Sequence, residues 1–389
     1  MHWRVTLSTC IVFGPGTVEQ VAAHTPGNRV VLVTSPGFSR RGVVGRIADS
    51  FGSRLVEVVD TITSNPEIAM LDAMAVSLRA SRPDALIGLG GGSAMDAAKV
   101  LAIGLNAPSG WTLAQFFAGE ATFGGWPGLP VTAIPTTAGT GAEVTPFATV
   151  WDKKAQRKHS LAGPEMMPSL ALLDPELTLG LPEAVTVATG LDAVSQALEA
   201  LWNCNANPVT DSWALRSLRL SMSALPQLLS LPGDLALRSH MLEASLLAGL
   251  AISHTRTALA HSMSYPITAR FGLPHGLACG FTVPAIFRHN VTYATARMDW
   301  IARELGFAAP DALETTLLNL MRIVGVRERV LRHVPNFSQL YSLTKYMLTP
   351  SRSNNTLFPV TEKSITAILQ DTEHLFFRET NSLGDCFKP

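Results

Sequence analysis

The chain has 389 residues, which is long enough for two domains with cores of their own. Lysine plus arginine and aspartate plus glutamate both number 30, so the formal net charge is zero. This balance argues against nucleic acid or an acidic membrane surface as a partner. Only 15% of the residues are charged while 47% are hydrophobic, which predicts a large core and a buried subunit interface, as in a homodimer or higher homo-oligomer.

The sequence predicts a cytoplasmic protein that is not embedded in a membrane. It contains no apolar run of the length expected to span a bilayer, and its first residues, MHWRVTLSTCIVFGPG, lack the charged segment and apolar core of a signal peptide. The cysteines show no C-x-x-C spacing, which favours reduced thiols over a disulfide or zinc framework. They are Cys10, Cys204, Cys279 and Cys386.

In chain order, the first 180 or so residues alternate short β-branched runs with helical patterns. Strands are expected over 29–35, 55–60, 84–90 and 131–137. Strands that alternate with helices predict a parallel sheet covered by helices.

From Glu183 to about Ile323 the pattern is helix after helix, rich in alanine and leucine and interrupted by prolines. We therefore expect an α/β domain over 1–181 and an all-helical domain over 182–389. The polar, turn-rich segment 335–358 predicts a surface excursion before a last helix that starts at Thr361.

A glycine run stands between an expected strand and an expected helix, in GLGGGSAMDAAK. Gly90, Gly91 and Gly92 allow backbone N–H groups to approach an anion, and Ser93 is a good N-cap for the helix that follows. The run matches neither G-x-x-x-x-G-K-[ST] nor G-x-G-x-x-G. It predicts a phosphate cradle, with a tight strand-to-helix turn as the alternative. A second loop, PTTAGTGAEVT, carries small hydroxyl residues and reads equally well as a ligand loop or a plain connection.

Candidate metal ligands occur in two helical segments. In GLDAVSQALEALW, Asp192 and Gln196 lie one helical turn apart, and further along the chain His261 and His275 are fourteen residues apart. Two imidazoles and a carboxylate suit Fe(II) or Zn(II), with coordination positions left for a substrate. The alternatives are core histidines with ordinary partners, and a solvated or hydrogen-bonded pair on the first helix.

These stretches, in this order, resemble the iron-containing (group III) alcohol dehydrogenases over nearly the whole chain. IVFGPGTVEQV resembles the opening hairpin of that family, GGGSAMDAAK and PTTAGTGAEVT its two cofactor loops, and GLDAVSQALE and HSMSYPITARFGLPHGLA its metal segments. The resemblance implies a Rossmann-like, dinucleotide-binding α/β domain and a helical metal domain. It also implies hydride transfer between NADPH or NADH and an aldehyde or alcohol at a divalent metal, Fe2+ first, with Zn2+ or Mn2+ as alternatives.

The resemblance also implies roles for individual residues. The metal ligands would be Asp192, Gln196, His261 and His275, with Gln196 standing where the family has a histidine. Ser35 stands where an acidic residue would select NAD, which together with Arg40 and Arg41 nearby suggests that NADP(H) is accepted. The implied cofactor contacts are Ser35, Asn65, Gly91, Gly92, Ser93, Asp96, Thr136, Thr140, Thr145 and Lys158.

The chain further resembles a branch of this family associated with phosphonate metabolism, whose members reduce phosphonoacetaldehyde to 2-hydroxyethylphosphonate. Arg256, five residues before His261, could hold a phosphonate bidentately, or could pair with a carboxylate at a subunit interface. Tyr265 or His254 would protonate the product. The alternatives are a general alcohol or diol dehydrogenase and a metal-dependent lyase of the dehydroquinate synthase type.

Overall fold

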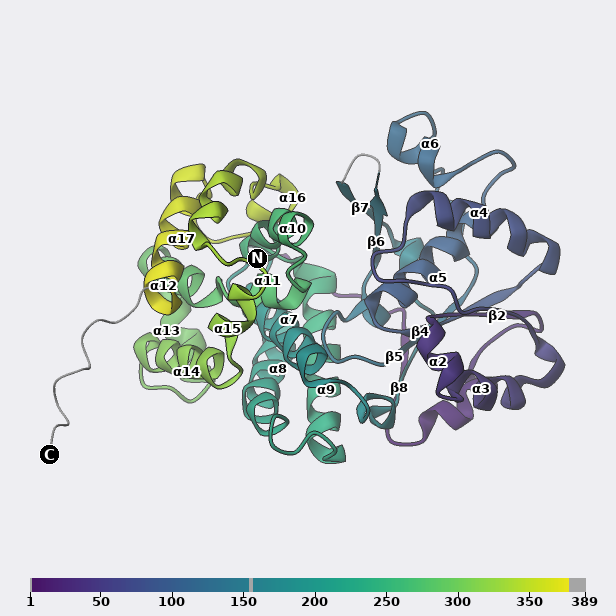
Figure 1. Cartoon of the computed structure of the whole chain (residues 1–389), viewed down its shortest axis with the longest axis horizontal. Helices are drawn as coiled ribbons and strands as arrows, with labels where there is room; N and C mark the ends of the chain where they lie inside the picture. The colour runs from purple at the N-terminus through teal and green to yellow at the C-terminus, as the bar shows by residue number, and fades with distance from the viewer. Residues whose placement is uncertain (1, 154–156, 378–389) are drawn as a thin grey trace, which may run out of the picture.

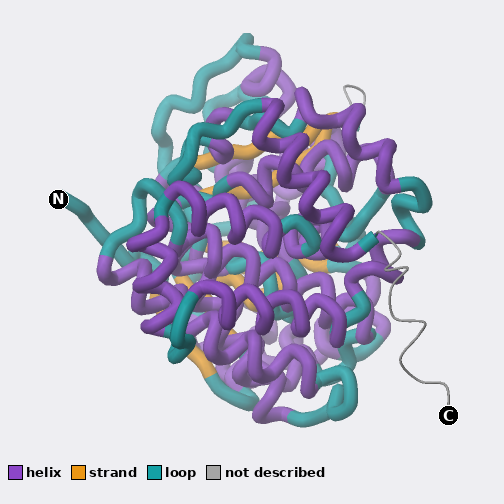
Figure 2. Tube along the Cα trace, turned by 90° about the vertical axis from the view of Figure 1, so that its left-hand side faces the viewer, coloured by secondary structure: helices purple, strands orange, loops and turns teal. Residues whose placement is uncertain are grey.

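The computed structural model describes residues 2–153 and 157–377. A sheet with its helices forms one half of the molecule, and a group of helices forms the other (Figure 1). Viewed from the helical half, helices cover almost the whole near face and the strands lie behind them (Figure 2). The expected order of an α/β part followed by a helical part is confirmed, while the boundary at 181/182 stays a prediction.

The sheet has six strands, all parallel, in the order β1-β8-β5-β4-β2-β3. The central strands are continuous apolar runs because helices cover both faces of a parallel sheet. Their bounds are β1 Cys10–Phe13, β2 Val30–Thr34, β3 Leu55–Val59, β4 Ala85–Gly90, β5 Val131–Pro135 and β8 Leu170–Leu173.

The connections of this half form the covering helices. The α-helices are α1 Val21–His24, α2 Pro36–Arg40, α3 Val43–Phe51, α4 Ile68–Leu78, α5 Gly92–Leu105 and α6 Leu113–Ala118. The 3-10 helices are η1 Thr17–Gln20, η2 Gly52–Arg54, η3 Arg79–Ser81, η4 Ala142–Val144, η5 Pro164–Met166 and η6 Pro175–Thr178.

Two details of the strands differ from the expectation. The segment expected to open as a hairpin instead contributes β1, which pairs in parallel with β8 and is followed by 3-10 helix η1. The antiparallel hairpin of β6 Phe147–Asp152 and β7 Arg157–Ala162, which the sequence reasoning did not predict, stands apart from the sheet. In Figure 1 this hairpin lies on the side of the sheet that faces α10 and α16.

The second half is helical. Its elements are α7 Glu183–Leu201, α8 Pro208–Gln227, α9 Leu235–Thr255, α10 Leu259–Phe271, α11 His275–Gly280, α12 Val283–Tyr293, α13 Thr295–Glu304, α14 Pro310–Ile323, α15 Val326–Leu331, η7 Phe337–Tyr346, α16 Pro350–Ser353 and α17 Glu362–Phe376. The last helix begins as expected, with Thr361 as its N-cap.

Helix α9 corrects one expectation drawn from the sequence. By length and composition alone it could cross a bilayer, although no apolar run had been expected to do so. However, 67% of its apolar window is buried inside the protein, where α9 packs on α7 and α8. Because other helices surround it, α9 is a core helix.

The segment 335–358 is not the surface excursion that its polar composition predicted. Leu340 and Met347 are fully buried, and Phe358 is nearly so. The segment packs on α10 and α17 through η7 and α16. It therefore belongs to the helical core, and it brings Arg352 of α16 to the hairpin residue Phe147.

Candidate metal centre and cofactor loops

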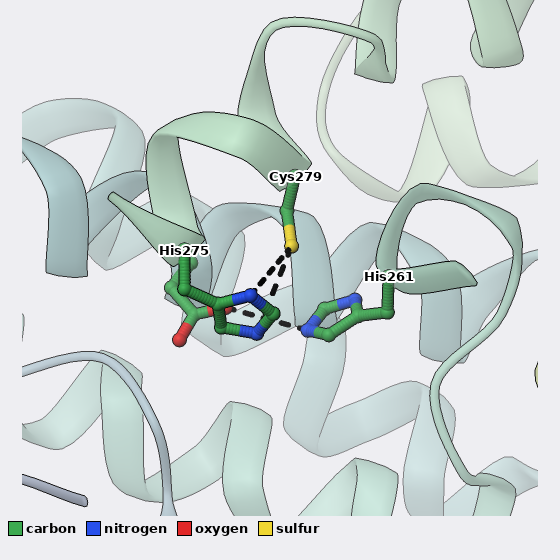
Figure 3. A group of neighbouring side chains, drawn as sticks. His261, His275 and Cys279 are labelled. Carbon is green, nitrogen blue, oxygen red and sulfur yellow. Dashed lines mark hydrogen bonds and ion pairs between the residues drawn. The ribbon is translucent and has the colours of Figure 1, made fainter. Parts of the chain in front are cut away.

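Four donor groups from three helices converge in the helical half. Asp192 of α7, His261 of α10, and His275 and Cys279 of α11 each offer a ligand atom, and these atoms all lie within 4.8 Å of one another. Figure 3 shows the Cys279 sulfur pointing at the His275 ring, with the His261 ring reaching the same place from the opposite side. The group contains three of the four expected metal ligands and one that was not expected.

The close approach of α11 to α7 depends on Gly276. A Cβ atom at that position would lie 1.9 Å from the Ala188 carbonyl oxygen and 2.7 Å from the Asp192 Cβ. No side chain fits in such a space, so the glycine allows α11 to lie against α7. His275 and Cys279, on either side of Gly276 along the helix, are thereby brought to Asp192.

Glu199 orients His261. This carboxylate is fully buried on α7, and its Oε2 lies 2.6 Å from His261 Nδ1. It also accepts hydrogen bonds from the backbone N–H groups of Ala258 and Ala260 at the start of α10. With Nδ1 occupied in this way, Nε2 is the nitrogen left to face Asp192, whose Oδ1 is 3.3 Å away. A carboxylate that holds the second nitrogen of a histidine is a common feature of metal-binding histidines.

The electrostatics of the group suit a cation. Burial alone lowers the pKa of His261, but Cys279, Glu199 and Asp192 outweigh it and hold that pKa well above 6.5. Burial, reinforced by Lys158, lowers the pKa of His275 to about 3, which keeps its imidazole neutral and available as a ligand. Asp192 Oδ1 is buried and, apart from its 3.3 Å contact with His261 Nε2, has no hydrogen-bond partner among the described residues. The residues therefore fit a divalent metal.

Gln196 lies one turn after Asp192 and is 2% exposed. Its Nε2 donates to the Thr140 carbonyl at 3.4 Å, and its Oε1 has no hydrogen-bond partner. The side chain thus connects α7 to the threonine loop of the α/β half. Its role as a metal ligand stays a prediction.

The two expected cofactor loops lie against each other. A Cβ on Gly92 would come within 3.0 Å of the Thr140 side chain, and a Cβ on Gly91 would lie 3.4 Å from Thr137 Oγ1. The Thr136 N–H donates to the Gly90 carbonyl. The two loops therefore approach closely, most tightly at Gly92, which agrees with a backbone cradle at the start of α5.

Other expected cofactor residues gather around the same helix. The Asn65 N–H, in a backbone with φ 60°, donates to Ser93 Oγ. Asp96 Oδ2 accepts from the Thr149 N–H and Oδ1 lies 3.7 Å from the buried Lys99 ammonium, which also bonds Thr145. Asp96 and Thr145 therefore already have protein partners.

Tyr265 lies between the metal group and a set of cations. Its ring stacks on His275, with 6.1 Å between ring centroids, and the Lys158 ammonium sits 4.4 Å above it. Burial raises the pKa of Tyr265, but Lys158, Arg352 and His261 together bring it below 10.0. The phenol is thus placed beside a metal ligand and made more acidic by its neighbours.

Two arginines, Arg256 and Arg352, face the same aromatic ring. Their guanidinium carbons lie 5.5 Å and 6.0 Å from the centroid of Phe147. Arg352 also hydrogen-bonds Tyr265. Burial and the charge of Arg352 lower the pKa of Arg256.

His254 has other partners. Its ring nitrogens contact the Thr6 backbone and Ser253, and its ring packs on Trp213. These bonds tie α9 to the N-terminal segment, which is a structural role. Ser35 occupies the N-cap position of α2, directly after β2, without a side-chain capping hydrogen bond; the resemblance expects the cofactor ribose there.

Sequence reasoning did not single out three residues near the site: Cys279, Glu199 and Arg352. Cys279 follows His275 by one helical turn and Glu199 follows Asp192 by two, so helical spacing was a usable signal for both. Arg352 had no such signal, because it lies 96 residues after Arg256 in a segment that was expected at the surface.

Comparison with known families agrees with this geometry. Residues 8–175 match the iron-containing alcohol dehydrogenase family, and residues 186–372 match the C-terminal domain of the Fe-containing alcohol dehydrogenase family. Among solved structures, a sulfoacetaldehyde reductase from Bifidobacterium kashiwanohense in complex with NAD+ superposes with a TM-score of 0.87 at 29% identity, covering 97% of this chain and 99% of that one.

Relatives by sequence point the same way. The chain is 40% identical to phosphonoacetaldehyde reductase of Streptomyces viridochromogenes over 267 residues, 67% of each protein. It is 34% identical to the probable alcohol dehydrogenase EutG of Escherichia coli, over 82% of this chain and 81% of the relative. With both family matches in register with the two halves of the fold, the chain belongs to the iron-containing alcohol dehydrogenase family.

Proposed function

We propose that this protein is a metal-dependent NAD(P)H aldehyde reductase whose substrate carries a phosphonate group, and that it converts phosphonoacetaldehyde to 2-hydroxyethylphosphonate. The observation that supports this substrate is the pair Arg256 and Arg352, which share one aromatic ring beside Tyr265.

The charge of the two arginines is not offset by a carboxylate of the described residues. Among residues 2–153 and 157–377, neither forms an ion pair with a carboxylate. The alternative, that Arg256 pairs with a carboxylate at a subunit interface, stays a prediction. Arg352 Nε is buried and has no hydrogen-bond partner. Two like charges in one place repel each other unless an anion joins them, and guanidinium groups bind phosphonate oxygens bidentately.

The location of the pair matches the size of the proposed substrate. Tyr265 contacts His275 on one side and hydrogen-bonds Arg352 on the other, so a single side chain separates the metal group from the arginines. A two-carbon aldehyde with a terminal anion is short enough to span such a gap. The names of two relatives, phosphonoacetaldehyde reductase and sulfoacetaldehyde reductase, concern aldehydes of this kind.

A divalent metal held by Asp192, His261 and His275 would supply Lewis-acid polarisation of the carbonyl, and a bound reduced nicotinamide would supply the hydride. The product oxygen then needs a proton. We assign this proton to the Tyr265 hydroxyl, because Lys158 and Arg352 stabilise the phenolate that remains. The Lys158 ammonium lies over the face of the Tyr265 ring and would offset the negative charge that develops there during turnover.

The test is a steady-state panel with each reduced nucleotide, using phosphonoacetaldehyde, sulfoacetaldehyde and propionaldehyde. The unmodified enzyme should have its highest kcat/KM on phosphonoacetaldehyde. In Arg256→Gln that value should fall by about 10- to 100-fold, the size of a lost charge-assisted pair, while the value for propionaldehyde changes little. Arg352→Gln should lower kcat/KM on all three aldehydes, and most on phosphonoacetaldehyde, because Arg352 also stabilises the Tyr265 phenolate. The exposed Arg327→Gln serves as the control.

Equal losses on all three aldehydes in Arg256→Gln would overturn the phosphonate assignment and leave a general alcohol or diol dehydrogenase. Turnover without net oxidation of NADPH would instead support the lyase alternative. We further propose a homo-oligomer, because only 15% of the residues are charged while 47% are hydrophobic, and light scattering of the purified protein would give its mass. We propose a cytoplasmic location from the cysteine spacing, which favours reduced thiols.

A further inference from the structure

We propose that Cys279 is a ligand of the metal, as a thiolate beside Asp192, His261 and His275, and that this set selects Zn(II) over Fe(II). The inference concerns metal binding and does not depend on which aldehyde is reduced. Gln196, the fourth ligand expected from sequence, would then serve to join α7 to the threonine loop.

The first argument is convergence. The Cys279 sulfur lies 3.9 Å from both ring nitrogens of His275, and His261 Nε2 lies 3.3 Å from Asp192 Oδ1. Ligand atoms around a tetrahedral ion with bonds of about 2.0–2.3 Å are about 3.3–3.8 Å apart. The four groups therefore need only small side-chain rotations to share one ion, since no pair of donor atoms is more than 4.8 Å apart.

The second argument concerns a buried carboxylate oxygen, Asp192 Oδ1, whose hydrogen-bonding capacity is largely unused. Asp192 is 3% exposed, and among the described residues its Oδ1 has no hydrogen-bond partner beyond a 3.3 Å contact with His261 Nε2, which belongs to the same group of four donors. A buried carboxylate oxygen without a partner is costly, whereas a cation at the centre of the group would satisfy it. Cys279 is likewise fully buried, so neither group can turn to solvent instead.

The third argument concerns the competing ligand. The Gln196 amide already donates from Nε2 to the Thr140 carbonyl, whereas the Cys279 thiol lies against the rings of His275 and His261, with Ser264 beside it, inside the metal group itself. A neutral amide oxygen is also a weaker ligand than a thiolate for a borderline ion. Thiolate ligands favour Zn(II), whereas sites built of carboxylate and imidazole alone also suit Fe(II).

Spectroscopy of the metal-loaded protein tests the proposal without reference to catalysis. Protein loaded with Co(II) should show an intense near-ultraviolet thiolate-to-cobalt band, and X-ray absorption of the Zn(II) form should show one sulfur neighbour at about 2.3 Å. Both signals should disappear in Cys279→Ser and persist in Gln196→Ala. Cys10→Ser, which changes an exposed cysteine outside the group, is the matched control.

Metal competition completes the experiment. We expect Zn(II) to displace Fe(II) from the unmodified protein under anaerobic conditions and to lose that advantage, by about tenfold or more, in Cys279→Ser. Circular dichroism of each apoprotein shows whether the variant is folded. Absence of a sulfur signal in the unmodified holoprotein, or its persistence in Cys279→Ser, would overturn the proposal.

Discussion

Glu199 and His261 form a buried carboxylate–imidazole pair, 2.6 Å from Oε2 to Nδ1, in which neither side chain has appreciable contact with solvent. The pair joins the last turn of α7 to the first turn of α10 and leaves His261 Nε2 facing the metal group. Its geometry makes Glu199 a positioning residue, because it acts on the metal through His261.

Replacing Glu199 with glutamine should weaken metal binding by about 10- to 100-fold, as is common when the partner of a metal-binding histidine is changed. The amide keeps the shape but offers one acceptor where Glu199 has two, so the His261 ring is no longer fixed. Competition with a chromophoric chelator measures the affinity. An unchanged affinity in a folded Glu199→Gln protein would contradict the role of Glu199.

Gly276→Ala should disrupt both packing and the metal group. The added methyl would lie 1.9 Å from the Ala188 carbonyl oxygen, so α11 must move away from α7 and carry His275 and Cys279 with it. Overpacking of this kind costs about 1–3 kcal/mol. Denaturant unfolding and metal titration should both register the change. Gly45→Ala on α3, where a Cβ meets nothing within 4 Å, is the control and should be neutral or stabilising.

Glu143 makes the stability depend on pH. It is buried beside Lys99 with Oε1 unpartnered, and burial raises its pKa from 4.5 to about 7. The folded protein therefore keeps a proton that the unfolded chain releases above pH 4.5, so this contribution to stability falls as the pH rises from 4.5 to 7 and is lost above that range. Glu143→Gln should remove the decline.

The check on Glu143 is the denaturant midpoint measured at pH 5 and at pH 8. The unmodified protein should lose more stability between the two values than Glu143→Gln does, with a difference on the order of 1–3 kcal/mol. Parallel curves for the two proteins would show that the carboxyl is already ionised at pH 5.

Ser35→Asp should shift the cofactor preference toward NADH. Ser35 stands at the end of β2, and a carboxylate there would hold the ribose hydroxyls of NADH and repel the 2′-phosphate of NADPH. We expect the ratio of kcat/KM for NADPH to that for NADH to fall by about tenfold or more. Ser53→Asp, which adds the same charge at an exposed position, should leave the ratio unchanged.

Local patterns in the sequence were enough to predict the alternation of strands and helices in the first half, the helical second half and the glycine loop. Helical periodicity and turn residues act over a few positions, so their signals survive without the fold. Asp192, His261 and His275 were predicted together through motifs that resemble a known family, and the structure brings them into one group.

What only the tertiary structure decided is which side chains share a site when they are distant in sequence. Arg256 and Arg352 meet at Phe147 because segment 335–358 packs into the helical half, and its polar composition gave no sign of this. Cys279 joins the metal group because Gly276 allows α11 to approach α7. Close packing between elements is a property of the whole fold, and no short stretch of sequence contains it.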